Sequence, residues 1–381
     1  MLRSSTGLSE PIVPRMYQLS RPPRSVSEGH GSGPEPTPGH INTGVPSPGT
    51  CHVRIFVPSH AMMSCSRMAY ILTYVWFVTL TVLVPDDFGV QALSQVDGVR
   101  PVRYTPGQPL PSDGLDAEVL VPKFLAGTDP RDVFAQLPNL KLVQLLSAGA
   151  ENFVGKIPDG VLLSTCRGAH GGSTAEWAIG ALLAIYREFL VFERARADGR
   201  WDYHLTDTLQ DKKVLIVGAG DLGEQLQRRL DPFNASSVLV GRTARDGIHG
   251  VDELPSLLPE FDAVVIFTPM TEETRHLVDA KFLAAMKDNA ILVNGARGPV
   301  VDTDALLAEL NSGRLRAALD VTDPEPLPED HPLWTAPGLL LTPHVAGSCT
   351  GHAHRAYAVV ASEIARYVAG ERPRNLVNGA Y

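Results

Sequence analysis

Arg297, Glu325 and His344 each follow a short apolar segment in the C-terminal half of the chain. If these segments are parallel strands, their carboxyl ends meet at one edge of the sheet, which is where open α/β sheets bind ligands. An arginine can bind a carboxylate through two parallel hydrogen bonds. A histidine can protonate a developing alkoxide, and a carboxylate bonded to the ring orients it and favours its charged form. The trio therefore indicates hydride transfer to a 2-keto acid, with Arg297 as anchor and His344 as proton donor.

A glycine-rich turn in the middle of the chain predicts a dinucleotide site. The sequence GAGDLG at 218–223 follows a strand pattern and precedes a helical one, which is the context in which G-x-G-x-x-G binds dinucleotides. Gly218 permits the tight turn, Gly220 lets the backbone approach the pyrophosphate, and Gly223 allows helix and strand to pack closely. The amides and dipole of the helix N-terminus would bind the phosphates.

The residue at the end of the second strand should read the adenosine ribose. Arg242 stands there, 19 residues after Gly223, where an acid would bind the 2′-hydroxyl of NAD. A guanidinium can bind a 2′-phosphate bidentately, which favours NADP. A solvated Arg242 that stacks on the adenine would accept either cofactor, so NAD stays open as the alternative.

The elements that must position these residues alternate between strands and helices from about residue 80. This alternation predicts a parallel sheet covered on both faces, and hence an α/β fold. Ser173-Thr-Ala-Glu176 matches a capping box and predicts a long helix from Ser173 to about Ala197. The expected strands are Val82–Val84, Ala117–Val121, Leu142–Leu146, Val161–Ser164, Lys213–Val217, Ser237–Val240, Ala263–Phe267, Ala290–Val293, Ala317–Val321 and Leu339–Thr342.

Composition bounds the class of protein. The 381 residues suffice for two domains and a remainder, and 44% hydrophobic with 20% charged residues is ordinary for a globular chain. A net charge of −9 argues against nucleic acid or an anionic membrane as main partner. Four scattered cysteines exclude a disulfide scaffold and suit a reducing compartment, which we expect to be the cytoplasm. No metal site is expected, since His352 and His354 are better explained as a helical surface pair.

The N-terminal part differs from the rest. Residues 1–67 are rich in Pro, Gly and Ser in their first 50 positions and are expected to be a disordered extension. The apolar run Ala69–Val84 is shorter than the roughly 20 residues that span a bilayer, and its end is typical of a buried first strand. We therefore expect no membrane association and a functional chain that starts near Met68 or later. An anchor at 69–84 is the disfavoured alternative.

In chain order these motifs resemble the D-isomer-specific 2-hydroxyacid dehydrogenase family over about residues 80–381. The resemblance rests on GAGDLG, on FTPMTEETR at 267–275, on NGARGPVVD at 294–302, on ALDVTDPEPLP with the later HPLW, and on TPHVAG at 342–347. It implies that Arg297, Glu325 and His344 are the catalytic residues.

The resemblance implies further roles. Asp320 would bind the nicotinamide carboxamide, and Thr268 and Pro269 would line the cofactor cleft. Ser147-Ala148-Gly149-Ala150 looks like the family's substrate loop, whose amides receive the substrate carboxylate beside Arg297 and His344. The expected cofactor-binding set is Gly218, Gly220, Asp221, Leu222, Gly223, Arg242, Thr243, Thr268, Pro269, Ala296, Asp320 and Gly347.

The family also implies two doubly wound parallel-sheet domains. A Rossmann cofactor domain at 173–346 would be inserted into a flavodoxin-like substrate domain at 80–172 that resumes at 347–381. Homodimerisation through the cofactor domain, with the helix from Ser173 taking part, is implied likewise.

Other dehydrogenase classes fit less well. The chain lacks Tyr-x-x-x-Lys and the Cys and His ligands of zinc dehydrogenases, and its glycine motif is too far from the start for an L-lactate type. Because no cluster of Arg or Lys near Ser147 indicates a phosphorylated substrate, we expect the substrate to be a small 2-keto acid such as glyoxylate or hydroxypyruvate. Phosphoglycerate dehydrogenase is the alternative. A dinucleotide-sensing corepressor is the alternative from another class, and the retained catalytic trio argues against it.

Overall fold

A computed structural model describes residues 79–123 and 129–377 of the chain. The expected N-terminal extension at 1–67 lies outside the described residues, and so does most of the apolar run that follows it. The end of that run, Leu80–Val84, is a fully buried strand, as expected. Within the described residues, no helix is both long and apolar enough to cross a membrane.

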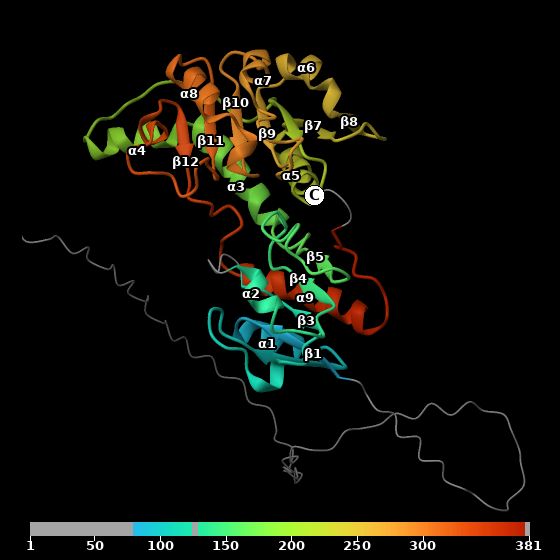
Figure 1. Ribbon diagram of the computed structural model, residues 1–381. Helices are drawn as coiled ribbons and strands as arrows, with labels where there is room; N and C mark the ends of the chain where they lie inside the picture. Colours follow the sequence, from blue (N-terminus) through green and yellow to red (C-terminus); the bar gives the residue numbers. More distant parts are fainter. Residues whose placement is uncertain (1–78, 124–128, 378–381) are drawn as a thin grey trace, which may run out of the picture. The chain divides into compact units, whose positions relative to one another are not determined.

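Five parallel strands form the first sheet in the order β2-β1-β3-β4-β5 (Figure 1). All five residues of β1 are buried, which is typical of a parallel strand covered on both faces. The strands are β1 (Leu80–Val84), β2 (Val99–Arg103), β3 (Val119–Leu120), β4 (Leu142–Gln144) and β5 (Leu162–Ser164).

Helices from both ends of the described chain cover this sheet. The C-terminal helix α9 (His352–Val368) packs Tyr357 and Val360 into one buried cluster with Val82. Val82 and Leu83 point to opposite faces, and Leu83 lies in a second cluster that contains Phe134 of α2. The other helices here are α1 (Asp87–Leu93) and α2 (Pro130–Phe134).

Seven parallel strands form the second sheet in the order β12-β11-β10-β9-β6-β7-β8 (Figure 1). The chain direction across the sheet reverses between β6 and β9, and such switch points are where doubly wound sheets bind ligands. The strands are β6 (Lys213–Val217), β7 (Ser236–Gly241), β8 (Ile248–Gly250), β9 (Ala263–Ile266), β10 (Ile291–Asn294), β11 (Arg316–Leu319) and β12 (Leu339–Leu341).

Helices cover both faces of the second sheet. Leu182 of α3 and Leu226 of α5 share a buried cluster with Ile216 of β6, whereas Leu283 of α7 packs with Leu215 on the opposite face. The fold is thus α/β with two parallel-sheet domains, which confirms the expected class. The helices are α3 (Gly171–Tyr186), α4 (Phe189–Ala197), α5 (Asp221–Leu230), α6 (Leu254–Leu257), α7 (Ala280–Ala285) and α8 (Thr303–Asn311), with 3-10 turns at Ser112–Gly114, Asp231–Phe233, Val251–Glu253, Leu258–Glu260, Gly298–Val300 and Pro332–Thr335.

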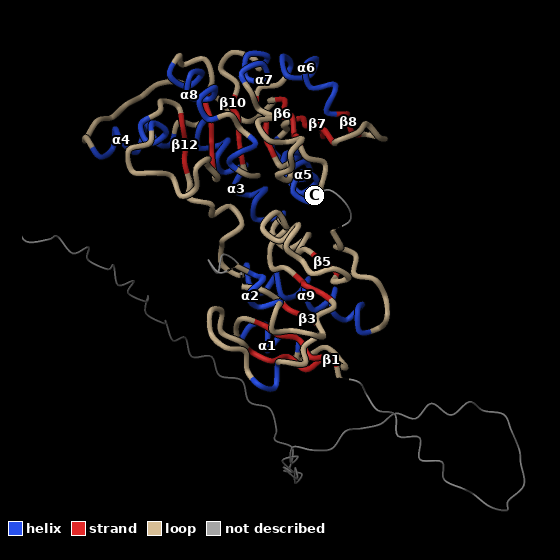
Figure 2. The backbone as a smooth tube through the Cα atoms, viewed as in Figure 1, coloured by secondary structure: helices blue, strands red, loops and turns tan. Residues whose placement is uncertain are grey.

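The prediction of one helix from Ser173 to Ala197 was wrong at its start and at its middle. Helix α3 begins at Gly171, and the Ser173 hydroxyl donates to the carbonyl of His170 at 3.0 Å instead of capping. The helix ends at Tyr186, whose hydroxyl donates to the carbonyl of Asp262 at 3.2 Å. Glu188 then has a left-handed backbone with φ +51°, and α4 follows as a separate segment (Figure 2). The bond of Ser173 to His170 is a local alternative to the capping box, whereas the contact of Tyr186 with Asp262 joins residues 76 positions apart and is not contained in the local pattern.

Candidate active site

The three expected catalytic side chains follow neighbouring strands of the second sheet. Arg297 comes three residues after β10, and His344 comes three residues after β12. Both line one cavity of about 670 Å³, together with Asp320 at the end of β11. Glu325 is not among the lining residues, and it reaches the site through its bond to His344. The structure therefore brings the trio together as the sequence predicts.

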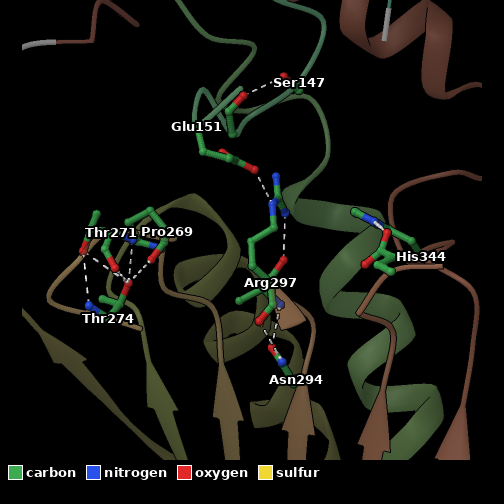
Figure 3. Close-up of polar contacts among 11 residues, drawn as sticks. Ser147, Glu151, Pro269, Thr271, Thr274, Asn294, Arg297 and His344 are labelled. Carbon is green, nitrogen blue, oxygen red and sulfur yellow. Dashed lines mark hydrogen bonds and ion pairs between the residues drawn. The ribbon is translucent and has the colours of Figure 1, made fainter. Parts of the chain in front are cut away.

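A buried amide fixes the turn that carries Arg297. The side chain of Asn294 donates to the carbonyl of Arg297 and accepts from the amide of Ala296, each at 3.0 Å. Gly298 packs so tightly against Thr322 that a Cβ would stand 1.9 Å from the carbonyl oxygen. The Arg297 guanidinium donates through Nη1 to Ala296 O at 2.7 Å and through Nε to Glu151 (Figure 3). The position of Arg297 is thus fixed at its backbone by Asn294 and at its guanidinium by Ala296 and Glu151.

His344 and Glu325 form a direct pair. Nδ1 of the imidazole lies 2.6 Å from Oε1 of Glu325, so Nε2 is the ring nitrogen that is left to serve a substrate. His344 has a left-handed backbone with φ +53°, a conformation that costs a non-glycine residue energy and must be held by its surroundings. Its amide donates to the carbonyl of Asp320 at 2.7 Å, which supplies part of that restraint.

Asp320 holds the loop on which His344 sits. The carboxylate is 3% exposed. Oδ1 accepts from the Thr342 hydroxyl at 2.6 Å and from the amide of Val345 at 2.8 Å, and Oδ2 accepts from the amide of Ala346 at 2.9 Å. The family resemblance predicts that Asp320 contacts the nicotinamide. The structure adds a role in positioning the proton donor, and the nicotinamide contact stays a prediction.

The glycine turn has the shape that a dinucleotide needs. Gly218 has φ +128°, and a Cβ there would stand 2.6 Å from the carbonyl oxygen of Phe267. A Cβ on Gly223 would stand 2.0 Å from the carbonyl oxygen of Gly218, whereas a Cβ on Gly220 would meet nothing within 4 Å. The turn is therefore closed on the protein side and open where a pyrophosphate would lie, at the start of α5. The expected cofactor residues that line the cavity are Gly220, Asp221, Leu222, Thr268, Pro269, Ala296, Asp320 and Gly347.

Four buried polar atoms of the cavity have no hydrogen-bond partner within the described residues. They are Oδ2 of Asp221, Oγ1 of Thr268, Nδ1 of His170 and the hydroxyl oxygen of Tyr357. Ribose hydroxyls and a carboxamide would supply donors and acceptors to such atoms. The residues present thus fit a nicotinamide dinucleotide.

The sequence analysis did not predict His170 as a residue of the site. The only available signal was its position directly before α3. Its Nε2 lies 2.9 Å from the carbonyl of Leu146, directly before the substrate loop. Because a carbonyl only accepts, Nε2 carries the proton and Nδ1 carries a lone pair. Burial lowers the pKa of His170 below its usual value of 6.5.

The two arginines after β7 lie near the glycine turn, outside the cavity lining. Arg242 is 63% exposed in its side chain and pairs with Glu273 at 3.2 Å. Arg245 donates through Nη2 to the carbonyl of Ala219, within the glycine motif, at 3.1 Å. Thr243 follows Arg242 and is exposed. This geometry is compatible with an Arg242 that binds the 2′-phosphate of NADP and with a solvated Arg242 that stacks on the adenine of either cofactor.

The expected substrate loop follows β4 and lines the cavity at Ser147, Ala148 and Gly149. The Ser147 hydroxyl donates to the carbonyl of Gly149 at 2.6 Å. Besides His170, the sequence analysis did not predict Glu151, which pairs with Arg297. It also did not predict the cations Lys123 and Arg167, which follow β3 and β5 and line the same cavity. An acid directly after a loop of small residues was the available signal for Glu151. The two cations become neighbours of the loop only through strand order.

A seven-stranded doubly wound sheet with this glycine turn is typical of a dinucleotide-binding domain. The sequence-family model described as D-isomer specific 2-hydroxyacid dehydrogenase, NAD binding domain, matches residues 179–346 of this chain. A glyoxylate reductase from Thermofilum pendens is 33% identical over 264 residues, which is 65% of this chain and 77% of that protein.

Solved structures agree with this assignment. A D-isomer specific 2-hydroxyacid dehydrogenase from Xanthobacter autotrophicus Py2, crystallised with NADPH and MES, has a TM-score of 0.70 at 31% identity over 79% of this chain and 98% of its own. An NADPH-dependent glyoxylate/hydroxypyruvate reductase from Sinorhizobium meliloti, crystallised with NADP and sulfate, has a TM-score of 0.66 at 25% identity over 78% and 98%. The chain belongs to the D-isomer specific 2-hydroxyacid dehydrogenase family, and it carries the family's NAD-binding domain.

Proposed function

We propose that this protein reduces a small 2-keto acid, such as glyoxylate or hydroxypyruvate, to the D-2-hydroxy acid. The observation that carries the proposal is the His344–Glu325 pair, whose His344 lines the same cavity as Arg297. The relative from Thermofilum pendens is named a glyoxylate reductase, and that name supports the choice of small substrates.

Each residue of the trio has one task in this reaction. The nicotinamide cofactor, when bound, supplies the hydride to the carbonyl carbon. Arg297 binds the substrate carboxylate and orients the carbonyl, with the loop amides at 147–149 as further donors. His344 donates the proton from Nε2 to the carbonyl oxygen, and the negative charge of Glu325 stabilises the imidazolium before the transfer. His344 is 31% exposed in its side chain, so it can regain a proton from solvent.

We propose NADP as the preferred cofactor, bound at the 2′-phosphate by Arg242 with help from Arg245. The Arg242–Glu273 bond is an exposed pair of little energy, so a phosphate can replace Glu273. Two neighbours named above were crystallised with NADPH or NADP. Arg242→Asp should lower kcat/KM for NADPH about 10- to 100-fold, since a charge-assisted bond contributes roughly 1.5–3 kcal/mol. A ratio of NADPH to NADH efficiency that moves less than about threefold would contradict this assignment.

The domain boundaries and the oligomeric state are part of the proposal. The cofactor domain would occupy 173–346, and the substrate domain would comprise 80–172 and 347–381. Between α4 and β6 the side chains of Trp201, Tyr203 and Leu205 are 94%, 83% and 90% exposed. An apolar stretch of this kind marks an interaction surface, and it supports a homodimer built through the cofactor domain. The free cysteines Cys166 and Cys349 suit the reducing cytoplasm.

The experiment that tests the activity is a panel of 2-keto acids, with NADPH and NADH in parallel, read by nicotinamide absorbance. Turnover of glyoxylate or hydroxypyruvate, lost in His344→Gln, is the expected result. No oxidation of either cofactor with any 2-keto acid would reject the proposed reaction.

A further inference from the structure

Glu151 places a negative charge directly on the anchor of the active site. Nε of Arg297 donates to Oε1 of Glu151, although the two residues are 146 positions apart. The side chains are only 26% and 28% exposed, and Figure 3 shows the guanidinium pointing at the carboxylate. Glu151 takes no part in the proposed transfer of hydride and proton.

The substrate loop is shaped around this pair. A Cβ on Gly149 would stand 2.2 Å from Nη2 of Arg297 and 2.6 Å from Oε2 of Glu151. The Ser147 hydroxyl bonds the carbonyl of Gly149 at 2.6 Å and holds the turn in place. A side chain at position 149 would therefore displace the ends of Arg297 and Glu151 from their present positions.

The bonds already made by Arg297 define where a substrate can bind. A guanidinium has five N–H donors in a fixed plane. One goes from Nε to Glu151, and one goes from Nη1 to the carbonyl of Ala296 at 2.7 Å. Three donors remain, one on Nη1 and two on Nη2, and a carboxylate can bind on the edge between these two nitrogens. A substrate carboxylate on that edge shares one cation with Glu151.

This sharing restricts the charge of the substrate. A substrate with one carboxylate gives Arg297 two anionic partners, and a second anion at C3 of that substrate would be a third negative charge near the one guanidinium. Like charges that are forced together in a partly dehydrated site cost binding energy. Lys123, Arg167 and Arg374 line the same cavity but are exposed, so solvent screens their attraction more than it screens the repulsion by the more buried Glu151. A hydroxyl or an ammonium at C3, in contrast, can donate a hydrogen bond to the carboxylate.

We propose that Glu151 determines substrate specificity by charge: the site takes 2-keto acids with a single negative charge and a neutral or hydrogen-bond-donating group at C3, and it rejects those with a second carboxylate or a phosphate there. The inference rests on the proposed 2-keto acid reduction and names its substrate class.

Glu151→Gln tests this inference because the amide oxygen still accepts from Nε of Arg297 while the charge is removed. The measured quantity is kcat/KM for pyruvate, hydroxypyruvate and oxaloacetate with saturating cofactor. The efficiency for oxaloacetate relative to pyruvate should rise roughly 10- to 100-fold, and the efficiency for hydroxypyruvate relative to pyruvate should fall. Glu151→Asp keeps the charge and should keep the wild-type preference. The matched control is Asp159→Asn, which removes an exposed charge outside the cavity lining and should leave the ratios unchanged.

The outcomes separate the inference from the proposed function. A ratio of oxaloacetate to pyruvate efficiency within about threefold of wild type in Glu151→Gln overturns the role of Glu151 and leaves the reductase activity standing. Wild type itself must prefer pyruvate to oxaloacetate at least tenfold, and equal efficiencies overturn the inference even if the variant does not fold. No turnover of any 2-keto acid by wild type rejects the function instead.

Discussion

Replacing Asp320 by Asn should lower both the stability and the turnover of the enzyme. The carboxylate of Asp320 is 3% exposed and accepts three hydrogen bonds from the loop that carries His344. An amide has only one acceptor oxygen. In either orientation its NH₂ group faces a backbone amide, that of Val345 or that of Ala346, so that two donors oppose each other.

The magnitude follows from these contacts. One hydrogen bond to a charged group is lost, which is about 1.5–3 kcal/mol, and a buried donor is left unsatisfied, which adds roughly 1–3 kcal/mol. Since the two effects overlap, we expect the free energy of unfolding to fall by about 2–4 kcal/mol. A displacement of His344 by about 1 Å would lower kcat roughly 100-fold.

Urea unfolding and steady-state kinetics on the same preparations measure both effects. The matched control is Asp279→Asn, at the N-cap of α7, where the side chain accepts from the amide of Phe282 at 2.8 Å. Asn is as good an N-cap as Asp, so this variant should be close to wild type. If Asp320→Asn unfolds at the wild-type urea concentration and keeps the wild-type kcat, the proposed restraint of the His344 loop is refuted.

Two further predictions concern titratable groups. Glu325→Gln should lower kcat for keto acid reduction, because the His344 ring loses the negatively charged partner 2.6 Å from Nδ1 that orients it; an unchanged kcat would show that the pair does not act together. Burial lowers the pKa of His170, so just below pH 6.5 the unfolded chain binds a proton that the folded chain does not, and the free energy of unfolding should fall as the pH drops below 6.5. Urea titrations should show a shallower fall in His170→Asn, and equal slopes would contradict this assignment.

The site could be predicted from the sequence wherever it depends on local features. Arg297 and His344 follow apolar strands, and in a parallel sheet the ends of such strands meet at one edge, so the pattern alone places both residues in one crevice. Each glycine of the motif at 218–223 is required by its local surroundings: Gly218 by a positive φ, Gly223 by its close approach to the carbonyl oxygen of Gly218, and Gly220 by the open space where the pyrophosphate would lie.

Features that depend on distant contacts could not be predicted. Nothing near Glu151 in the sequence indicates Arg297, because the pair forms only when both sheets have folded. The start of α3 at Gly171 was missed because Ser173 matches a capping box, yet its hydroxyl bonds the carbonyl of His170. Helix α3 ends at Tyr186, whose hydroxyl donates to the carbonyl of Asp262, directly before β9. The contacts of Glu151 and Tyr186 join residues that are distant in the sequence, whereas the bond of Ser173 to His170 is a local alternative to the capping box.

The most direct test of the account is the configuration of the product. Hydroxypyruvate and NADPH should be converted by the wild-type protein to D-glycerate, and chiral chromatography of the reaction mixture measures this. In the proposed reaction Arg297 binds the carboxylate and His344 the carbonyl oxygen of the substrate, so that one face of the carbonyl would be presented to the cofactor. Formation of D-glycerate alone is the predicted result. L-glycerate, a racemic mixture or the absence of glycerate would contradict the assignment.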